Sequence, residues 1–570
     1  MFSSLSYGSD SFLATEKALH LPLQLTQRAQ KRDSQTCASG LGDVLDVTYS
    51  VLVDVGGTET PLVLDTGSSD LWLVSDGCHT SACVNSGVPL YPQGSLHSTG
   101  LDAQLLYGDS RTGTHALGPI GTDVTGVAGL SVSGQCFAAI ADTNTTVLDT
   151  GSAGIFGLGF PPVSVIWRQL LETDISGAPP SLPRRSRLPP LELTTANSSS
   201  VSTDGSFIGR PPFPSFTFLS PHRRIRQVKA SLSDPSALAI EAFATYGPFV
   251  TRLIAQQALA LPMVAITLQR DTFEVGGNAG LLSLGGLPSG VQEDHLRWVP
   301  VRGYSADEGG LPPAPEASNE IYPLLWEIPI DDVYFDGTKL PRSTLSAPSI
   351  SLSALMDTGN SLIRGPQDVV NNILAQLGGP TGSFDCDTPH NLSFEIGGEL
   401  FPIDPRDFAR PHTANNSANS PRCTGAVAAT DPPGEGGFLY SWSLGDPFLK
   451  SVLAAYYYGN LTHPSQDPPR VGFISTVPDD AGEALREAVQ AAISAGAIFP
   501  ATSEPAPSGT YMATTTGPGG VPQATHLAAS YSSNARSSNA ARITDYADGW
   551  TSLLVISMNL GAALLGFACL

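Results

Sequence analysis

The tripeptide Asp-Thr-Gly occurs three times in this chain, beginning at Asp65, Asp149 and Asp357. A chain of this length and average composition would contain it about 0.1 times by chance. Two carboxylates held close together cannot both ionise, so two such motifs could share one proton and act as base and acid in a single site. Asp65 and Asp357 each follow an apolar run and precede small polar residues, which is typical of a strand that ends in a turn. Asp149 instead leads into a Gly-rich apolar run.

The segments around these motifs have the pattern of β-strands. In residues 45–53, apolar side chains alternate with mostly polar ones, as they do in a half-buried strand. Short apolar runs separated by Gly, Pro, Asn and Asp continue to about residue 475, so we expect an all-β structure up to that point. Beyond it, apolar residues recur every three or four positions, which predicts an amphipathic helix over residues 479–495.

The composition limits the classes of protein to which the chain can belong. Its 570 residues are too many for one hydrophobic core. With 58 Gly, 47 Pro and only 14% charged residues, it has the composition of a turn-rich protein and not of a coiled coil, a collagen or a multi-span membrane protein. The 29 Lys and Arg against 52 Asp and Glu give a net charge of −23, which argues against a nucleic-acid partner and suits a protein that works in acid.

The motifs and their neighbours resemble the pepsin-like aspartic proteases over residues 43–475. Residues 65–72 (DTGSSDLW) are very similar to the family's first catalytic loop, and residues 106–110 (LYGDS) resemble its flap, whose tyrosine closes over substrate. Residues 155–159 (IFGLG) resemble the strand that supports the first loop, and the third Asp-Thr-Gly matches the second catalytic loop. The resemblance thus places Asp149 just before the supporting strand, and we expect it to lie outside the site. Elements of the family's second lobe resemble residues 296–301, 326–328, 444–449 and 470–473.

The resemblance implies an all-β, bilobal fold with an active-site cleft between the lobes and aspartic endopeptidase activity without a cofactor. Asp65 and Asp357 would be the catalytic pair: the ionised member activates a water that attacks the peptide carbonyl, and the protonated member donates to the carbonyl oxygen. Because the acid role needs the shared proton, we expect activity only at acid pH. The positions that would contact substrate or shape the loops are Gly67, Ser68, Trp72, Tyr107, Gly108, Asp109, Ile155, Gly359, Asn360 and Ser361.

One position departs from the family pattern. The family usually has Thr or Ser after its second Asp-Thr-Gly, where this chain has Asn360. The Asn360 amide can donate to Asp357, but with a different geometry, which leaves the balance of the two aspartate pKa values open. A catalytically inactive binding protein and a cell-wall adhesin are the alternatives to an enzyme. The presence of Asp65, Tyr107 and Asp357 together favours the enzyme.

The cysteines point to disulfides and not to a metal site. The resemblance implies the pairs Cys78–Cys83 and Cys386–Cys423, and subtraction then pairs Cys37 with Cys136, leaving Cys569 in the apolar tail. A zinc site at Cys78, His79 and Cys83 would need a second Cys or His pair at finger spacing, which the sequence lacks. We therefore expect no metal.

The two ends of the chain suggest a protein that is exported and attached to the cell surface. Residues 553–570 form an apolar tail without a following basic residue, after a polar spacer and small residues at 539–541, which is typical of a GPI signal with Asn539 as its attachment site. A single membrane span is the alternative. Export is also indicated by N-x-S/T sequons at Asn144, Asn197, Asn391, Asn415 and Asn460. These features resemble the yapsin-type fungal enzymes, although no signal peptide is visible near Met1, and we expect the true start to lie upstream.

These observations predict a monomer, with proteins or peptides as substrates, that is divided into successive segments. Residues 177–234 are rich in Pro, Ser and Arg and could be a surface loop, a processed loop or translated intron. The predicted segments are a pro-segment (1–32) ending in Lys31-Arg32, an N-terminal lobe (33–292), a C-terminal lobe (293–476), a helix (477–500), a Ser/Thr/Pro/Gly-rich stalk (501–549) and the tail (550–570).

Overall fold

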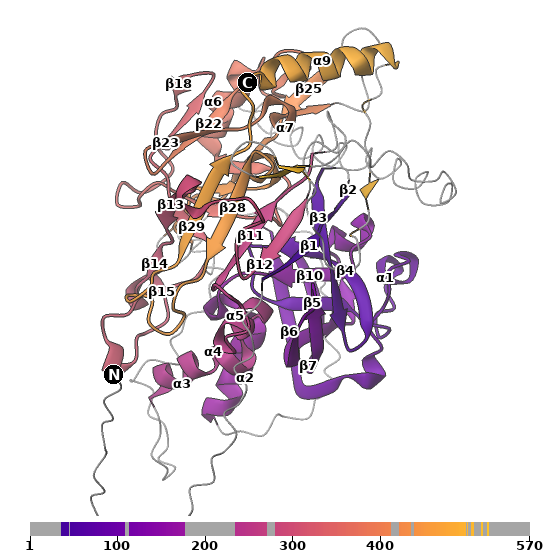
Figure 1. Cartoon of the computed structure of the whole chain (residues 1–570), viewed down its shortest axis with the longest axis vertical. Coiled ribbons are helices and arrows are strands. Elements are labelled where there is room, and N and C mark those ends of the chain that lie inside the picture. The colour runs from indigo at the N-terminus through magenta and orange to yellow at the C-terminus, as the bar shows by residue number, and fades with distance from the viewer. Residues whose placement is uncertain are drawn as a thin grey trace, which may run out of the picture.

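The computed structural model is mostly β-sheet with few helices, which confirms the predicted bilobal all-β fold. Figure 1 shows the N-terminal half in indigo and purple beside the C-terminal half in pink and orange. The structure describes residues 36–44, 46–108, 113–176, 234–270, 280–411, 421–434, 438–496, 499, 503–504, 506, 515–516 and 521–523. The predictions that fall outside these residues concern Asp109, Asn197, Asn415, Asn539, Cys569, the pro-segment, residues 177–233 of the insertion, most of the stalk and the apolar tail.

A ten-stranded sheet forms most of the N-terminal half, in the order β30-β2-β3-β4-β10-β5-β8-β7-β6 with β9 beside β7. The hairpin between β3 and β4 turns at Gly56 and Gly57, whose φ angles of +60° and +83° favour glycine. The strands are β2 Gly42–Val44, β3 Thr48–Val55, β4 Thr58–Asp65, β5 Leu71–Val74, β6 His97–Tyr107, β7 Thr114–Val127, β8 Leu130–Ile140, β9 Asp142–Thr143, β10 Gly154–Gly157 and β30 Ser503–Glu504.

The C-terminal half contains several smaller sheets. A five-stranded sheet consists of β16 Glu327–Pro329, β19 Ser353–Met356, β27 Trp442–Leu444, β20 Ile363–Pro366 and β26 Val427–Thr430. The next consists of β18 Thr338–Lys339, β17 Asp332–Phe335, β22 Leu392–Ile396 and β23 Glu399–Pro402. The others are β21 Ser383–Asp385 with β25 Arg422–Gly425 and β24 Ala409–Pro411, β14 Gly303–Tyr304 with β15 Tyr322–Pro323, and β31 Thr515–Thr516 with β32 Pro522–Gln523.

A six-stranded sheet joins the two halves, since it takes strands from both sides of the predicted lobe boundary at residue 292. Behind the first Asp-Thr-Gly loop, the Leu158 N–H donates to the Asp65 carbonyl, and the Leu158 carbonyl accepts from Trp326 at 3.0 Å and Tyr458 at 2.6 Å. The halves are therefore tied together directly behind this loop. In order, the strands are β1 Cys37–Gly40, β12 Leu281–Leu284, β11 Met263–Thr267, β28 Val452–Tyr457, β29 Arg470–Ser475 and β13 Arg297–Pro300.

The helices pack against the sheets and against one another. The predicted C-terminal helix is confirmed as α9 Ala481–Ser494, which contacts α7 of the C-terminal half through a stripe that includes buried Leu485 and Val489. No helix among the described residues is both long and apolar enough to cross a membrane. The remaining helices are α1 Ser81–Asn85, α2 Val165–Ser176, α3 Pro235–Glu241, α4 Phe243–Tyr246, α5 Phe249–Ala255, α6 Gln367–Gln376, α7 Pro405–Phe408 and α8 Asp446–Leu449.

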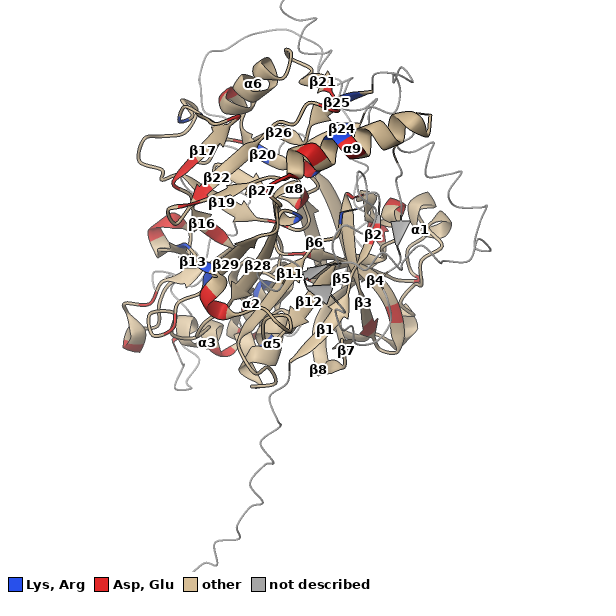
Figure 2. Ribbon diagram, turned by 45° about the horizontal axis from the view of Figure 1, so that its top comes forward, with Lys and Arg blue, Asp and Glu red and all other residues tan. Residues whose placement is uncertain are grey.

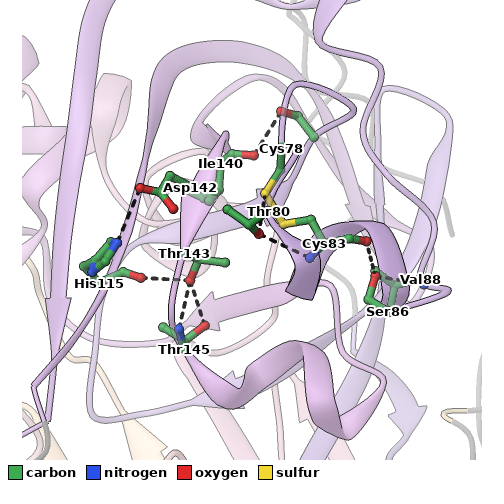
Figure 3. Close-up of a disulfide and its surroundings, with 11 residues drawn as sticks. Cys78, Thr80, Cys83, Ser86, Val88, His115, Ile140, Asp142, Thr143 and Thr145 are labelled. Atoms are coloured by element: carbon green, nitrogen blue, oxygen red, sulfur yellow. Dashed lines mark hydrogen bonds and ion pairs between the residues drawn. A yellow bond between two sulfur atoms is a disulfide. The ribbon is translucent and has the colours of Figure 1, made fainter. Parts of the chain in front are cut away.

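Two of the three predicted disulfides are present. Cys78–Cys83 closes the short loop that leads into α1 (Figure 3), and Cys386–Cys423 lies in the C-terminal half. The third pairing is wrong, because Cys37 and Cys136 are both free thiols. Cys37 lies in β1 of the six-stranded sheet and Cys136 in β8 of the ten-stranded sheet, so counting cysteines paired residues that belong to different sheets.

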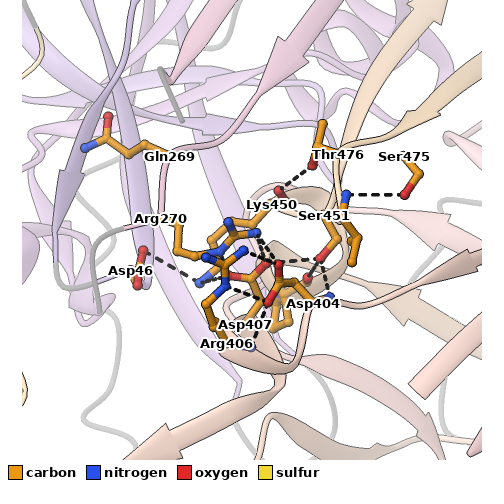
Figure 4. Close-up of polar contacts among 12 residues, drawn as sticks. Asp46, Gln269, Arg270, Asp404, Arg406, Asp407, Lys450, Ser451, Ser475 and Thr476 are labelled. Carbon is orange, nitrogen blue, oxygen red and sulfur yellow. Dashed lines mark hydrogen bonds and ion pairs between the residues drawn. The ribbon is translucent and has the colours of Figure 1, made fainter. Parts of the chain in front are cut away.

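A cluster of buried charges connects the two halves (Figure 4). The Arg270 guanidinium donates to both carboxylate oxygens of Asp407, at 2.7 and 2.6 Å, and its Nη2 lies 3.5 Å from Asp404. The Lys450 ammonium lies 3.6 Å from both Asp407 and Asp46, and Asp46 belongs to the N-terminal half. All of these side chains are at least nine-tenths buried, so each charge depends on its partners and not on water.

Candidate functional site

Matching sets of three strands hold Asp65 and Asp357. Asp65 is the last residue of β4, which runs parallel to β10, and β10 also pairs antiparallel with β5. Asp357 directly follows β19, which runs parallel to β27, and β27 pairs antiparallel with β20. Each aspartate therefore lies at the end of a strand that has a neighbour on both sides, β3 and β10 for β4 and β16 and β27 for β19, and this positions the loop.

Reciprocal hydrogen bonds join the two loops through Thr66 and Thr358, which were not among the predicted site residues. Each threonine hydroxyl accepts from the backbone N–H of the other at 3.0 Å. Each hydroxyl also donates to a carbonyl of the opposite strand, Thr66 to Met356 at 2.8 Å and Thr358 to Leu64 at 2.6 Å. The sequence feature that could have indicated them is the threonine at the middle position of both motifs, because a threonine hydroxyl can donate one hydrogen bond and accept another.

Gly67 and Gly359 allow the loops to approach closely. A Cβ at Gly67 would lie 2.3 Å from Oδ1 of Asp357, and a Cβ at Gly359 would lie 2.6 Å from Oδ1 of Asp65. Each glycine thus faces the carboxylate of the opposite loop, which brings the predicted pair together. The two glycines are needed here for space as well as for the turn.

Asp65 is 5% exposed and receives two strong hydrogen bonds. The Gly67 N–H donates to its Oδ1 at 2.8 Å, and the Ser68 hydroxyl donates to its Oδ2 at 2.5 Å. Burial raises the pKa of Asp65, and these two donors oppose that shift because they stabilise the carboxylate.

Asp357 receives weaker support. The Gly359 N–H donates to its Oδ1 at 3.0 Å, and the Ser443 hydroxyl lies 3.3 Å from its Oδ2. Burial and the charge of Asp65 raise the pKa of Asp357 to about 7, against the lowering effects of Gly359, Ser443 and Arg364. The pair is thus unequal, with the proton favoured on Asp357.

Asn360 does not donate directly to Asp357, although the sequence suggested that it could. Its side-chain amide donates to the Ser443 hydroxyl at 2.9 Å, and its Oδ1 accepts from the Leu362 N–H at 3.2 Å and the Arg364 guanidinium at 3.3 Å. These partners direct the amide away from Asp357, and Ser443 lies between it and the carboxylate. Ser443 lies 86 residues from Asp357, so no local spacing could have identified it.

The flap strand brings Tyr107 near the pair. The Trp72 indole N–H donates to the Tyr107 hydroxyl at 2.7 Å, which holds the ring at the end of β6. Burial, followed by the charges of Asp70 and Asp65, raises the pKa of Tyr107 well above its usual range, so it stays a neutral hydroxyl. The adjacent Gly108 has a φ of +86°, where the chain turns.

The other residues singled out in the sequence lie at different positions relative to the two loops. Ile155 is buried in β10, paired with Val63 and Trp72, and supports the first loop from behind. Ser361 is partly buried next to Asn360 in the second loop. Asp149 is exposed in a 3₁₀ turn, Thr146–Thr150, which confirms that it lies outside the site.

Cys78 and Cys83 are joined in a disulfide, so the zinc interpretation of that segment is wrong. Among the residues that the structure describes, no three His, Cys, Asp or Glu side chains are grouped so that they could hold a metal ion.

Comparison with known proteins matches both halves of the chain. The sequence model of the family described as "Eukaryotic aspartyl protease" matches residues 48–171 and 236–463, and thus leaves out the expected insertion. Major aspartyl peptidase 1 of Cryptococcus neoformans var. grubii is 23% identical over 466 residues, which cover 79% of this chain and 73% of that protein. Cathepsin E of Mus musculus is 24% identical over 430 residues (73% and 79%), and pepsin A of Suncus murinus is 24% identical over 432 residues (74% and 81%).

Proposed function

Because the chain belongs to the eukaryotic aspartyl protease family, we propose that it is an active endopeptidase that hydrolyses peptide bonds at acid pH. The observation that carries this proposal is the pair formed by Asp65 and Asp357, whose loops are joined by reciprocal threonine hydrogen bonds. Each loop also places its glycine against the opposite carboxylate. Such an arrangement keeps two carboxyl groups in fixed positions, as general acid–base catalysis requires.

The unequal hydrogen bonding assigns the two roles. Asp65 accepts the shorter bonds, which favour its carboxylate, so it would take a proton from a water molecule between the pair. That water would attack the peptide carbonyl carbon. Asp357 would hold the shared proton and donate it to the carbonyl oxygen as the tetrahedral intermediate forms.

The flap would contribute by covering the peptide. Tyr107 is held by Trp72 close to the pair, and the next residue, Gly108, has the positive φ of a turn. Closure over a bound peptide would exclude water other than the attacking molecule and strengthen the hydrogen bonds in the site.

The first test is hydrolysis of an unfolded protein substrate between about pH 2.5 and 7. The chain would be expressed in a secreting host and freed of residues 1–32, with a pepstatin-treated sample and an Asp357→Asn variant beside it. Cleavage that is strongest in acid and lost in both controls would support the proposal. A folded sample that binds peptide but cleaves at no pH would overturn it in favour of a binding protein.

We also propose that the enzyme is glycosylated and attached to the cell surface by a GPI anchor, as in the yapsin-type fungal enzymes. The support is the sequence of the tail and of Asn539, together with the exposure of the sequon residues Asn144 and Asn391. Phosphatidylinositol-specific phospholipase C should release the activity from intact cells. Activity that stays with the membrane after this treatment, but is secreted when residues 550–570 are deleted, would indicate a membrane span instead.

A further inference from the structure

The hydrogen bonds around Asn360 have a fixed direction. A guanidinium has only donors, so the atom of Asn360 that faces Arg364 must be the oxygen. The backbone N–H of Leu362 faces the same oxygen, which requires the same orientation of the amide. The Asn360 NH₂ group is therefore directed at the Ser443 hydroxyl, 2.9 Å away.

This orientation decides what the Ser443 hydroxyl does with its own proton. Because its oxygen accepts from Asn360, the proton is free to be donated, and Asp357 Oδ2 lies 3.3 Å away. The neighbouring strands hold the serine in place, since Ser443 is paired with Leu355 in β19 and with Arg364 in β20. A fixed series of donors thus runs from Arg364 through Asn360 and Ser443 to Asp357.

We propose that Ser443 is the positioning residue of the second catalytic aspartate, supplying from β27 the hydroxyl that the loop itself lacks at Asn360. On the other aspartate, Ser68 supplies a hydroxyl from three residues away in the same loop. Asn360 therefore acts through Ser443. The hydroxyl that the second loop lacks is supplied by Ser443 on the adjacent strand. This inference rests on the proposed endopeptidase activity.

The consequence can be measured as a change in pH dependence. The Ser443 hydroxyl and the charge of Arg364 both stabilise the Asp357 carboxylate, against burial and the charge of Asp65. Removing the hydroxyl should therefore let Asp357 keep its proton to higher pH. The titratable groups around Asp357 that such a change leaves in place are Asp65, Arg364, Tyr440, Asp446 and Tyr456.

The test is the pH profile of kcat/KM for the full chain, expressed and processed in a secreting host, with Ser443→Ala. We expect its basic limb to move up by about half to one pH unit and kcat to fall about three- to tenfold. The matched control is Ser441→Ala, because Ser441 is similarly buried just before the same strand and, within the described part of the chain, its hydroxyl bonds to the Ser353 carbonyl and not to either aspartate. That control should leave the limb in place.

A rescue separates positioning from a merely structural role. The double variant Asn360→Thr/Ser443→Ala returns a hydroxyl to the loop and should restore most of the limb and of kcat. Asn360→Ala alone should move the limb in the same direction as Ser443→Ala, and the two changes together should move it no further than Ser443→Ala does. This single variant also tests the proposal if Ser443→Ala does not fold.

Two outcomes are distinguishable failures. If the unmodified chain cleaves no substrate, the proposed function fails. If the unmodified chain cleaves in acid but neither Ser443→Ala nor Asn360→Ala moves the basic limb, or if the two shifts add fully, Ser443 does not position Asp357 and this inference is overturned.

Discussion

Ser68 and Ser443 place one hydroxyl on each carboxylate, but their distances differ, 2.5 Å to Asp65 and 3.3 Å to Asp357. The shorter bond stabilises the charged form of Asp65 more strongly. This difference is the physical reason for assigning the base to Asp65 and the shared proton to Asp357. Replacing the two serines should therefore affect opposite limbs of the pH profile.

Ser68→Ala should raise the pKa at which Asp65 ionises, because the variant loses a donor to the carboxylate while burial persists. The acid limb of kcat/KM should move to higher pH by about one unit, with the basic limb unchanged. The measurement is the same pH series used for Ser443→Ala, which serves as the opposite case. A shift of the basic limb instead would show that the roles of the two aspartates are reversed.

Between elements, the threonine bonds are the connection that fixes the two loops relative to each other. Thr358→Val keeps the shape of the side chain but leaves the Leu64 carbonyl and the Thr66 N–H without their partner. Because both groups are buried, the free energy of unfolding should fall by about 2–5 kcal/mol, measured by urea denaturation at pH 5.

Thr150→Val provides the matched control for this change, since it lies in the third Asp-Thr-Gly. Among the described residues, the Thr150 hydroxyl donates to the Val147 carbonyl of the same turn and to no other strand or loop, so the loss of unfolding free energy should stay below about 1 kcal/mol. Equal losses at both threonines would contradict a special role for the bonds between the loops.

The buried charge cluster gives a second prediction about elements. Although burial alone would raise it, the charges of Arg270 and Arg406 hold the pKa of Asp404 below its usual range. The stability that this pairing provides is therefore present at neutral pH and is lost as pH falls through the folded-state pKa. Arg270→Met removes one partner and leaves buried carboxylates under-compensated.

The variant Arg270→Met should lose about 3–5 kcal/mol at pH 7 and less at pH 3, where the carboxylates can protonate. Urea unfolding at the two pH values measures both. Arg297→Met is the control, because the side chains of Arg297 and its partner Glu399 are 47% and 48% exposed. Loss of this surface ion pair should lower the free energy of unfolding by less than about 1 kcal/mol. An equal loss at both pH values would show that packing, and not charge, is what Arg270 contributes.

At the scale of the whole molecule, the net charge of −23 fits a protein that works in acid, where part of this negative charge is neutralised. Acidic residues are spread over both halves, and basic ones are fewer (Figure 2), in keeping with 29 Lys and Arg against 52 Asp and Glu. Some of the basic side chains, such as Arg270 and Lys450, are buried in the cluster and add nothing to the surface. Protonation of surface carboxylates in acid would reduce the repulsion among them.

The sequence predicted what is encoded locally. The motif beginning at Asp65 carries its own turn, glycine and hydroxyl, and the alternation in β3 is visible residue by residue. Ser443 could not be found in this way, because it meets Asp357 only through the parallel pairing of β19 and β27. The error at Cys37 and Cys136 has the same origin, since a count of cysteines contains no information on which sheet each belongs to.

The segments before and after the insertion, which end in α2 and begin with α3, should stay packed together when most of the insertion is removed. The family match omits residues 172–235, while α2 and α3 on either side contact each other, and Tyr246 of α4 bonds to Asp174 of α2 at 2.8 Å. The flanking ends are therefore positioned by their own contacts. Replacing residues 178–232 with a flexible linker of about six residues should leave acid cleavage within about twofold and the melting temperature within about 4 °C. Loss of both would show that the segment is a working part of the lobe, whereas loss of cleavage alone would place it at the substrate.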